Sequence, residues 1–319
     1  MVYRKTGEGS TLGLKRTNYL VLIGVLGILV ATTVLCVCIA WYGRDIEMSA
    51  SDKADESTQT VEESAYEDSD ITEVAPEKID FQPVIDKWVK TVGGEKGVVV
   101  YDLDRNEMAG GYHADELFAT ASLYKLFIVY EGYRRVESGE WSIDDSAGFT
   151  GYTIGECLDL AIRESYSPCA ETLWSMIGED ELDIILEKEY RIEDSLVSDF
   201  VATPTDVAKM MQIFYEHKAI SDATLLAQVK DSFLNQPETE YNWRQGLPSG
   251  FSENVNVYNK VGWEYNDETG MWNIYNDAAI VDFVDSNRHF AVVVMTSGVP
   301  YQKIREFGSM LEEYFNENI

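Results

Sequence analysis

Hydrophobic and polar positions divide the chain into three parts. Residues 20–40 are all apolar, Gly or Thr, and a run of this length suits a helix that crosses the hydrocarbon core of a membrane. Residues 43–80 are rich in Ser, Thr, Asp and Glu and predict an acidic, disordered linker, because so few bulky apolar residues cannot offset the entropy of ordering. Residues 81–319 show periodic apolar positions and predict one folded domain.

The folded part has strands at both ends and helices between them. Apolar residues at helical spacing predict helices at 81–92, 117–136, 154–178 with an interruption near Pro168, 205–217 opened by Thr203-Pro204, and 302–318. Runs rich in β-branched and aromatic residues predict strands at 97–103, after the turn at 104–107, and at 255–263, 272–284 and 289–296, the last three as a meander. This order predicts an α+β layered fold, in which the first and last thirds form one antiparallel sheet flanked by helices, around an inserted all-helical region.

Residues flanking the apolar run predict its orientation. Tyr19, Trp41 and Tyr42 resemble an interfacial aromatic belt, and basic residues precede the run while acidic residues follow it. The positive-inside rule therefore predicts a cytoplasmic tail at 1–18, a transmembrane signal-anchor helix at 19–42, and an extracytoplasmic domain at 81–319. The alternative is a cleaved signal peptide, but the run is longer than a usual h-region and no small-x-small cleavage site follows it closely.

Composition excludes some partners. The 319 residues carry a formal net charge of -31, which argues against nucleic acid or an anionic lipid surface as a partner. His113, His217 and His289 lie far apart and lack metal-ligand spacing, so we predict neither a metal nor a cofactor. The pattern leaves the oligomeric state open.

Cys157 and Cys169 are the cysteines of the predicted outer domain. In one continuous helix, twelve residues would span about 18 Å, too far for a disulfide. A bond between them therefore requires a turn, which residues 165–168 supply with Pro168. A disulfide and two free buried thiols are both compatible with the sequence.

Two short motifs carry candidate chemistry. Ser122-Leu123-Tyr124-Lys125 is the only Ser-x-x-Lys in the chain, and helical positions three apart share a face. A lysine in a desolvated site loses proton affinity and, when neutral, can accept the proton of a serine hydroxyl. Lys260-Val261-Gly262 lies within a predicted strand, where the glycine would let a substrate backbone approach closely.

Together these segments resemble the class A β-lactamase and penicillin-binding serine hydrolase superfamily. Besides Ala121–Lys125 and Lys260–Trp263, the resemblance rests on Ser165–Leu173, which begins with Ser165-Tyr166-Ser167, on Ala202–Ala208, and on Tyr275–Val281. These segments follow in the family's order and cover nearly all of residues 81–319. The resemblance implies that Ser122 is the nucleophile, Lys125 its proton acceptor, and Ser165 a proton shuttle toward the leaving nitrogen. It also implies a β-lactam or peptidoglycan-like substrate.

The same resemblance implies the roles of the substrate-binding residues. The positive charge of Lys260 would act on Ser122 and attract a substrate carboxylate. The backbone amides of Ser122 and Trp263 would form the oxyanion hole, beside Gly262. Ser167 would stand where the family has an asparagine that holds the acyl group.

The sequence departs from the family pattern at three places. Ser167 replaces the asparagine, and Val261 replaces a threonine that could donate a hydrogen bond. Glu187, Glu189 and Glu193 precede Thr203-Pro204, but none has the setting of a deacylating carboxylate, and none is assigned that role. The sequence thus favours an extracytoplasmic serine hydrolase that forms an acyl-enzyme. The alternative is a catalytically silent module that binds or senses cell-wall peptides.

Overall fold

One five-stranded antiparallel sheet organises the described part of the chain, which in this computed structural model is residues 76–217, 220–237, 241–266 and 271–319. The strand order is β2-β1-β7-β6-β5. The strands are β1 (Glu95–Asp102), β2 (Glu107–Tyr112), β5 (Val255–Asn266), β6 (Met271–Phe283) and β7 (Arg288–Ser297). Val99 of β1 lies opposite Val293 of β7, so the prediction that both ends of the domain share one sheet is confirmed, as is the meander of the last three strands.

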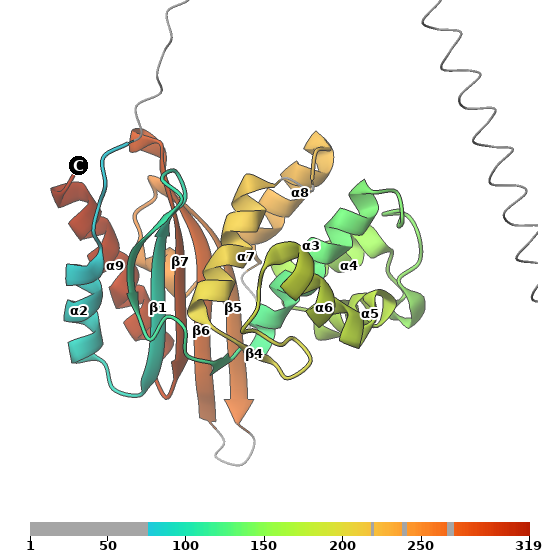
Figure 1. The fold of residues 1–319 in the computed structure, drawn as a ribbon, viewed down its shortest axis with the longest axis horizontal. Helices are drawn as coiled ribbons and strands as arrows, with labels where there is room; N and C mark the ends of the chain where they lie inside the picture. Colours follow the sequence, from blue (N-terminus) through green and yellow to red (C-terminus); the bar gives the residue numbers. More distant parts are fainter. Residues whose placement is uncertain (1–75, 218–219, 238–240, 267–270) are drawn as a thin grey trace, which may run out of the picture. The chain divides into compact units, whose positions relative to one another are not determined.

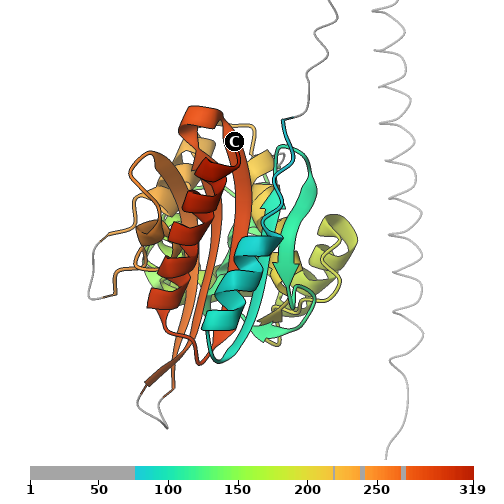
Figure 2. The same cartoon turned by 90° about the vertical axis from the view of Figure 1, so that its left-hand side faces the viewer.

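Two helices cover one face of this sheet. They are α2 (Gln82–Thr91) and α9 (Tyr301–Glu317), which lie side by side in front of the strands in Figure 2. The rings of Trp88 and Phe307 lie 5.0 Å apart between the two helices, and both side chains are buried. Apolar residues at helical spacing therefore bury one stripe of each helix against the sheet, as predicted.

The other face carries the helical region (Figure 1). Its helices are α3 (Tyr124–Glu137), α4 (Ile154–Arg163), α5 (Ser167–Ile177), α6 (Glu179–Tyr190), α7 (Pro204–Glu216) and α8 (Ala223–Leu234). Of these, α7 packs on β1, β6 and β7, and α8 packs on β5. The sequence patterns did not predict α6 or α8. Along β7, Val292 and Val294 face α9 while Val293 faces the helical region, so the sheet separates two hydrophobic cores.

The segment before α3 differs from the helix predicted at 117–136. Residues Phe118–Ala119 form a short strand, β3, which pairs with β4 (Val201–Ala202), and residues Ala121–Leu123 form a 3-10 turn. The α-helix begins only at Tyr124. Pairing with a strand some eighty residues away overrides the local helical pattern, and a single sequence window carries no sign of that pairing.

The predicted helix at 154–178 is broken, but slightly before the predicted position. Helix α4 ends at Arg163 and α5 begins at Ser167, with Pro168 inside its first turn, where its missing N–H costs nothing. The reversal brings the Cα atoms of Cys157 and Cys169 to 4.8 Å, and the two residues form a disulfide. The link joins α4 to α5 next to the turn at residues 164–166.

The N-terminal predictions fall mostly outside the described residues. The tail at 1–18, the membrane helix at 19–42 and most of the linker at 43–80 lie there, and none of the helices described from residue 76 onward is long and apolar enough to span a membrane. Residues 76–80 of the predicted linker pack on the domain. Ile79 is buried, and Arg288 donates a hydrogen bond to the carbonyl of Glu77.

Candidate active site

Ser122 lies in the 3-10 turn that leads into α3, beside the edge strand β5. The preceding residue, Ala121, has a φ of 42°, a conformation that L-residues rarely adopt. One turn later, Lys125 points back toward the serine, and its Nζ lies 2.8 Å from Ser122 Oγ. The predicted Ser-x-x-Lys pair is therefore in direct contact.

Lys125 is completely buried, and its other polar contacts are with one turn. Its Nζ donates to the backbone oxygen of Ser165 at 2.7 Å and to Ser167 Oγ at 3.0 Å. Burial lowers its pKa to about 8, although the negative charge of Glu171 opposes that shift. Near neutral pH, a useful fraction of Lys125 is thus neutral and able to accept a proton.

Ser165 joins two lysines. It lies between α4 and α5 with a φ of 56°, which turns the chain sharply. Its Oγ accepts a hydrogen bond from Lys260 Nζ at 2.8 Å and lies 3.4 Å from Lys125 Nζ. A hydroxyl between two amines can relay a proton in either direction.

Lys260 comes from β5 and is 1% exposed. Its Nζ donates to Ser165 Oγ and to the carbonyl of Val261, the latter at 2.8 Å. Burial, and then the positive charge of Lys125, lowers the pKa of Lys260 well below its usual value. Lys260 therefore contacts Ser165 from a buried position and does not lie at the surface, where the prediction had it attract a substrate carboxylate.

Gly262 is required by the protein's own backbone. A Cβ at this position would lie 2.3 Å from the carbonyl oxygen of Thr120 and 3.0 Å from the backbone nitrogen of Leu123. The prediction placed a substrate backbone against this glycine, but the turn that carries Ser122 occupies that space. Gly262 thus sets how closely β5 approaches the serine.

The side chain of Trp263 lies away from this site. It packs against Trp243, Tyr275 and Tyr301, in an aromatic cluster on the α9 side of β5. Side chains alternate along a strand, so Lys260 and Gly262 face Ser122 while Trp263 faces the opposite side. The indole therefore lies on the face of β5 opposite Ser122, and the role predicted for Trp263 in the oxyanion hole concerns its backbone amide.

The sequence analysis missed Asn276, which holds the nucleophile segment in place. This fully buried side chain of β6 donates to the carbonyls of Ala119 and Thr120, at 2.8 and 3.1 Å, and accepts from the backbone of Thr296. The residue stands within the Tyr275–Val281 segment that carried the family resemblance. Its role depends on strand pairing, so only the register of β6 reveals it.

The remaining predicted residues divide into two groups. Ser167 lies in the site and contacts Lys125, whereas Val261 is 1% exposed and presents no group to a ligand. Glu187, Glu189 and Glu193 are exposed. The carboxylate whose charge acts on Lys125 belongs to Glu171 of α5, which the sequence analysis did not single out.

Across the described segments, no cluster of His, Cys, Asp or Glu suits a metal ion.

This fold and this set of residues define a class A β-lactamase-like serine hydrolase fold. The sequence pattern of the β-lactamase enzyme family matches residues 80–315, so the chain belongs to that family. No curated protein matches the chain.

Solved structures of this class have the same fold. An ancestral class A β-lactamase is 19% identical, with a TM-score of 0.61 over 73% of this chain and 99% of its own. PBP-A is 16% identical, with a TM-score of 0.63 over 76% and 99%. A class A β-lactamase from Bacteroides cellulosilyticus is 17% identical, with a TM-score of 0.62 over 73% and 96%. At these identities the likeness concerns the fold alone.

Proposed function

We propose that this protein is a serine hydrolase that forms an acyl-enzyme at Ser122 with a β-lactam or a peptidoglycan-like amide. The observation that carries the proposal is the 2.8 Å contact between Ser122 Oγ and Lys125 Nζ in a site where burial lowers the pKa of Lys125 to about 8. A solvated lysine would be protonated and could not act as a base.

The proposed acylation moves one proton through Lys125 and Ser165. Ser122 Oγ attacks the substrate carbonyl carbon while its proton passes to neutral Lys125. Backbone N–H groups of Ser122 and Trp263 would stabilise the oxyanion. Lys125 then returns the proton through Ser165 Oγ to the leaving nitrogen, the C–N bond breaks, and an ester at Ser122 remains. Water hydrolyses that ester to release the acid.

We further propose that the domain acts outside the cell membrane, anchored by residues 19–42. The apolar run, its aromatic flanks and the charge asymmetry support this placement. In fractionated cells, the full chain should stay in the membrane pellet after alkaline carbonate treatment. Release of the full chain by carbonate would contradict the anchor.

The acylation test is intact-mass spectrometry of the full-length chain after incubation with a penicillin and with an activated ester. The expected result is an adduct of one acyl group on the wild type and none on Ser122→Ala. Ser138→Ala is a matched control, because this exposed hydroxyl lies just after α3 and donates to the carbonyl of Arg135. The lifetime of the adduct separates a hydrolysing β-lactamase from a penicillin-binding enzyme.

A second candidate function is a catalytically silent module that binds cell-wall peptides. The burial of Val261 favours it, because the position offers no hydroxyl to a substrate carboxylate. If no acyl donor labels the wild type while a muropeptide binds equally to the wild type and to Ser122→Ala, the silent module replaces the hydrolase.

A further inference from the structure

A cavity lies between helices α7 and α8 and the sheet, and Ser122 is not part of its lining. Its volume is about 390 Å³, within the range of small-molecule sites. Its apolar wall consists of Phe214, Leu226, Val229, Phe233, Tyr258 and Ile280. The proposed acylation uses none of these residues. The cavity is therefore an unassigned space of ligand size.

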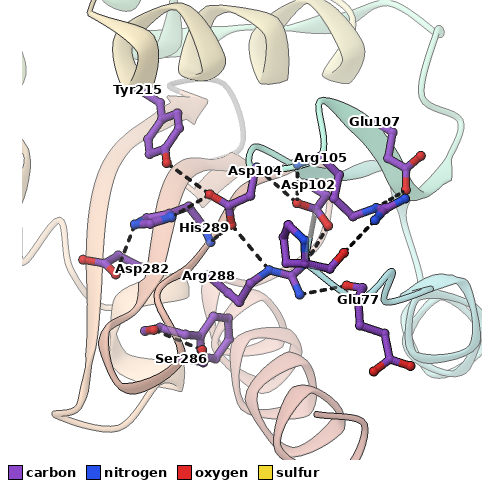
Figure 3. A network of polar contacts seen from close by, with 12 residues as sticks. Glu77, Asp102, Asp104, Arg105, Glu107, Tyr215, Asp282, Ser286, Arg288 and His289 are labelled. Carbon is purple, nitrogen blue, oxygen red and sulfur yellow. Dashed lines mark hydrogen bonds and ion pairs between the residues drawn. The ribbon is translucent and has the colours of Figure 1, made fainter. Parts of the chain in front are cut away.

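One end of this cavity is polar. His289 and Asp282 line it, and Figure 3 shows His289 between Asp282 and Asp104. His289 Nδ1 lies 2.8 Å from Asp104 Oδ1, which also accepts a hydrogen bond from the Tyr215 hydroxyl at 3.2 Å. Asp104 is thus fully engaged, and this contact fixes the imidazole ring.

Asp282 is held less tightly. Its Oδ1 lies 3.6 Å from His289 Nε2, beyond hydrogen-bond distance, and its Oδ2 accepts from Asn256 at 3.2 Å. Its side chain keeps 20% of its surface exposed. The nearest cation to Asp282 is the protonated imidazole of His289, which forms a long ion pair with it because Asp104 holds the ring. A carboxylate oxygen at the end of an apolar cavity, with its cation at this distance, leaves room for a closer ligand cation.

Nearby carboxylates also affect the tyrosines that line this cavity. Burial raises the pKa of Tyr215 to about 12, and the charges of Asp104 and then Asp282 add to the shift. Burial followed by the charge of Asp282 raises the pKa of Tyr258. Lys230 lies at the exposed rim, and His289 is fixed by Asp104. The hydrogen bond to Asp104, and then the charges of Asp104 and Asp282, raise the pKa of His289. Two carboxylates therefore face one imidazolium at this end, and the balance favours a positive ligand group over a negative one.

We propose that this cavity binds a small molecule with an aromatic or branched apolar body and one ammonium group, which bonds to Asp282. The body would fill the space between Phe214, Val229 and Ile280. Tyr258 and Lys260 lie two positions apart on the same face of β5, so the occupant would lie on the face of the strand that also carries Lys260. The proposal does not depend on acylation of Ser122.

Isothermal titration of the full-length chain tests this site with three probes of similar shape. 2-Phenylethylamine carries the cation, 2-phenylethanol is neutral, and 3-phenylpropanoate is an anion. We expect the amine to bind one site with a Kd on the order of 0.5 mM, the alcohol about tenfold more weakly, and the anion not at all.

Variants test whether the binding measured by titration takes place in this cavity. Asp282→Asn should weaken the amine about tenfold and leave the alcohol unchanged, because only the charged bond is lost. Asp285→Asn is the matched control, since Asp285 carries the same charge in an exposed turn three residues later. Val229→Trp should fill the cavity and abolish binding of both probes. Leu226→Trp fills it from a less buried position if Val229→Trp does not fold.

The outcomes are distinguishable from those of the acylation test. Ser122→Ala should bind the amine as the wild type does, whether or not Ser122 forms an adduct. The proposal is overturned if the amine does not bind the wild type saturably, if the alcohol binds as tightly as the amine, or if Asp285→Asn weakens the amine as much as Asp282→Asn does.

Discussion

The pKa of Lys125 sets the pH at which Ser122 can be activated. This group must be neutral to accept a proton, and its neutral fraction increases as the pH rises through about 8. We therefore predict that the rate of Ser122 acylation by an activated ester rises about tenfold per pH unit below this value and levels off above it. Stopped-flow or mass-resolved adduct formation between pH 6 and pH 9.5 measures the profile.

Lys125→Arg separates this effect from other titrations, because arginine keeps its charge throughout the range. The variant should acylate at least about a hundredfold more slowly and lose the rise near pH 8. A wild-type midpoint that persists in Lys125→Arg would show that another group is the base.

Asn276 is the residue whose loss should most disturb the segment before Ser122. Asn276→Ala leaves the carbonyls of Ala119 and Thr120 and the N–H of Thr296 without their partner. A buried unsatisfied group costs about 1–3 kcal/mol, so we predict a loss of at least about 2 kcal/mol of unfolding free energy in urea. Acylation should slow as well.

Asn273→Ala is the matched control on the same strand. Asn273 is exposed, and its amide makes only a 3.4 Å contact with Ser297 Oγ. Its free energy of unfolding should change by less than about 0.5 kcal/mol. Equal effects of the two variants would mean that the buried amide does not hold the segment.

At the scale of elements, Gly262 controls the contact between β5 and the 3-10 turn. Gly262→Ala would place a Cβ 2.3 Å from the Thr120 carbonyl, and backbone cannot yield as a flexible side chain does. We predict a loss of about 1–3 kcal/mol in unfolding free energy and slower acylation. Gly93→Ala, which meets nothing within 4 Å, should change neither quantity measurably.

The disulfide between α4 and α5 should stabilise the turn that carries Ser165. The two cysteines are 12 residues apart, and a loop of this size is worth about 3 kcal/mol in the chain-entropy account. The double variant Cys157→Ala, Cys169→Ala should therefore have a lower Tm in calorimetry. A reductant should lower the Tm of the wild type but not that of the double variant, and an unchanged wild-type Tm would contradict the prediction.

The sheet lies between the two hydrophobic cores and joins them into one folding unit. Val293 and Val294 are neighbours on β7, both fully buried, and face opposite cores. Val293→Ala and Val294→Ala should each cost about 2 kcal/mol and leave one cooperative transition. Tryptophan fluorescence and far-UV circular dichroism should give the same urea midpoint. Separate midpoints in either variant would show that the helical region unfolds on its own.

From the sequence alone, the shared sheet, its terminal meander and the proximity of Ser122 and Lys125 could be predicted, whereas helices α6 and α8 could not. Runs of β-branched and aromatic residues are local features, so β5, β6 and β7 could be predicted as strands without knowing their partners. The contact between Ser122 and Lys125 follows from a spacing of three within one turn of chain. Cys157 and Cys169 gave two readings, and only the reversal between α4 and α5 distinguished them.

Contacts between segments that lie far apart in the sequence became known only from the tertiary structure. The pairing of β3 with β4 turned the start of a predicted helix into a strand and a 3-10 turn, and strand alternation sent the side chain of Trp263 away from the site. Register placed Asn276 under the segment before Ser122 and Gly262 against the Thr120 carbonyl. These contacts join residues far apart in the chain, and burial, which lowers the pKa values of both lysines, is a property of that assembly rather than of any local pattern.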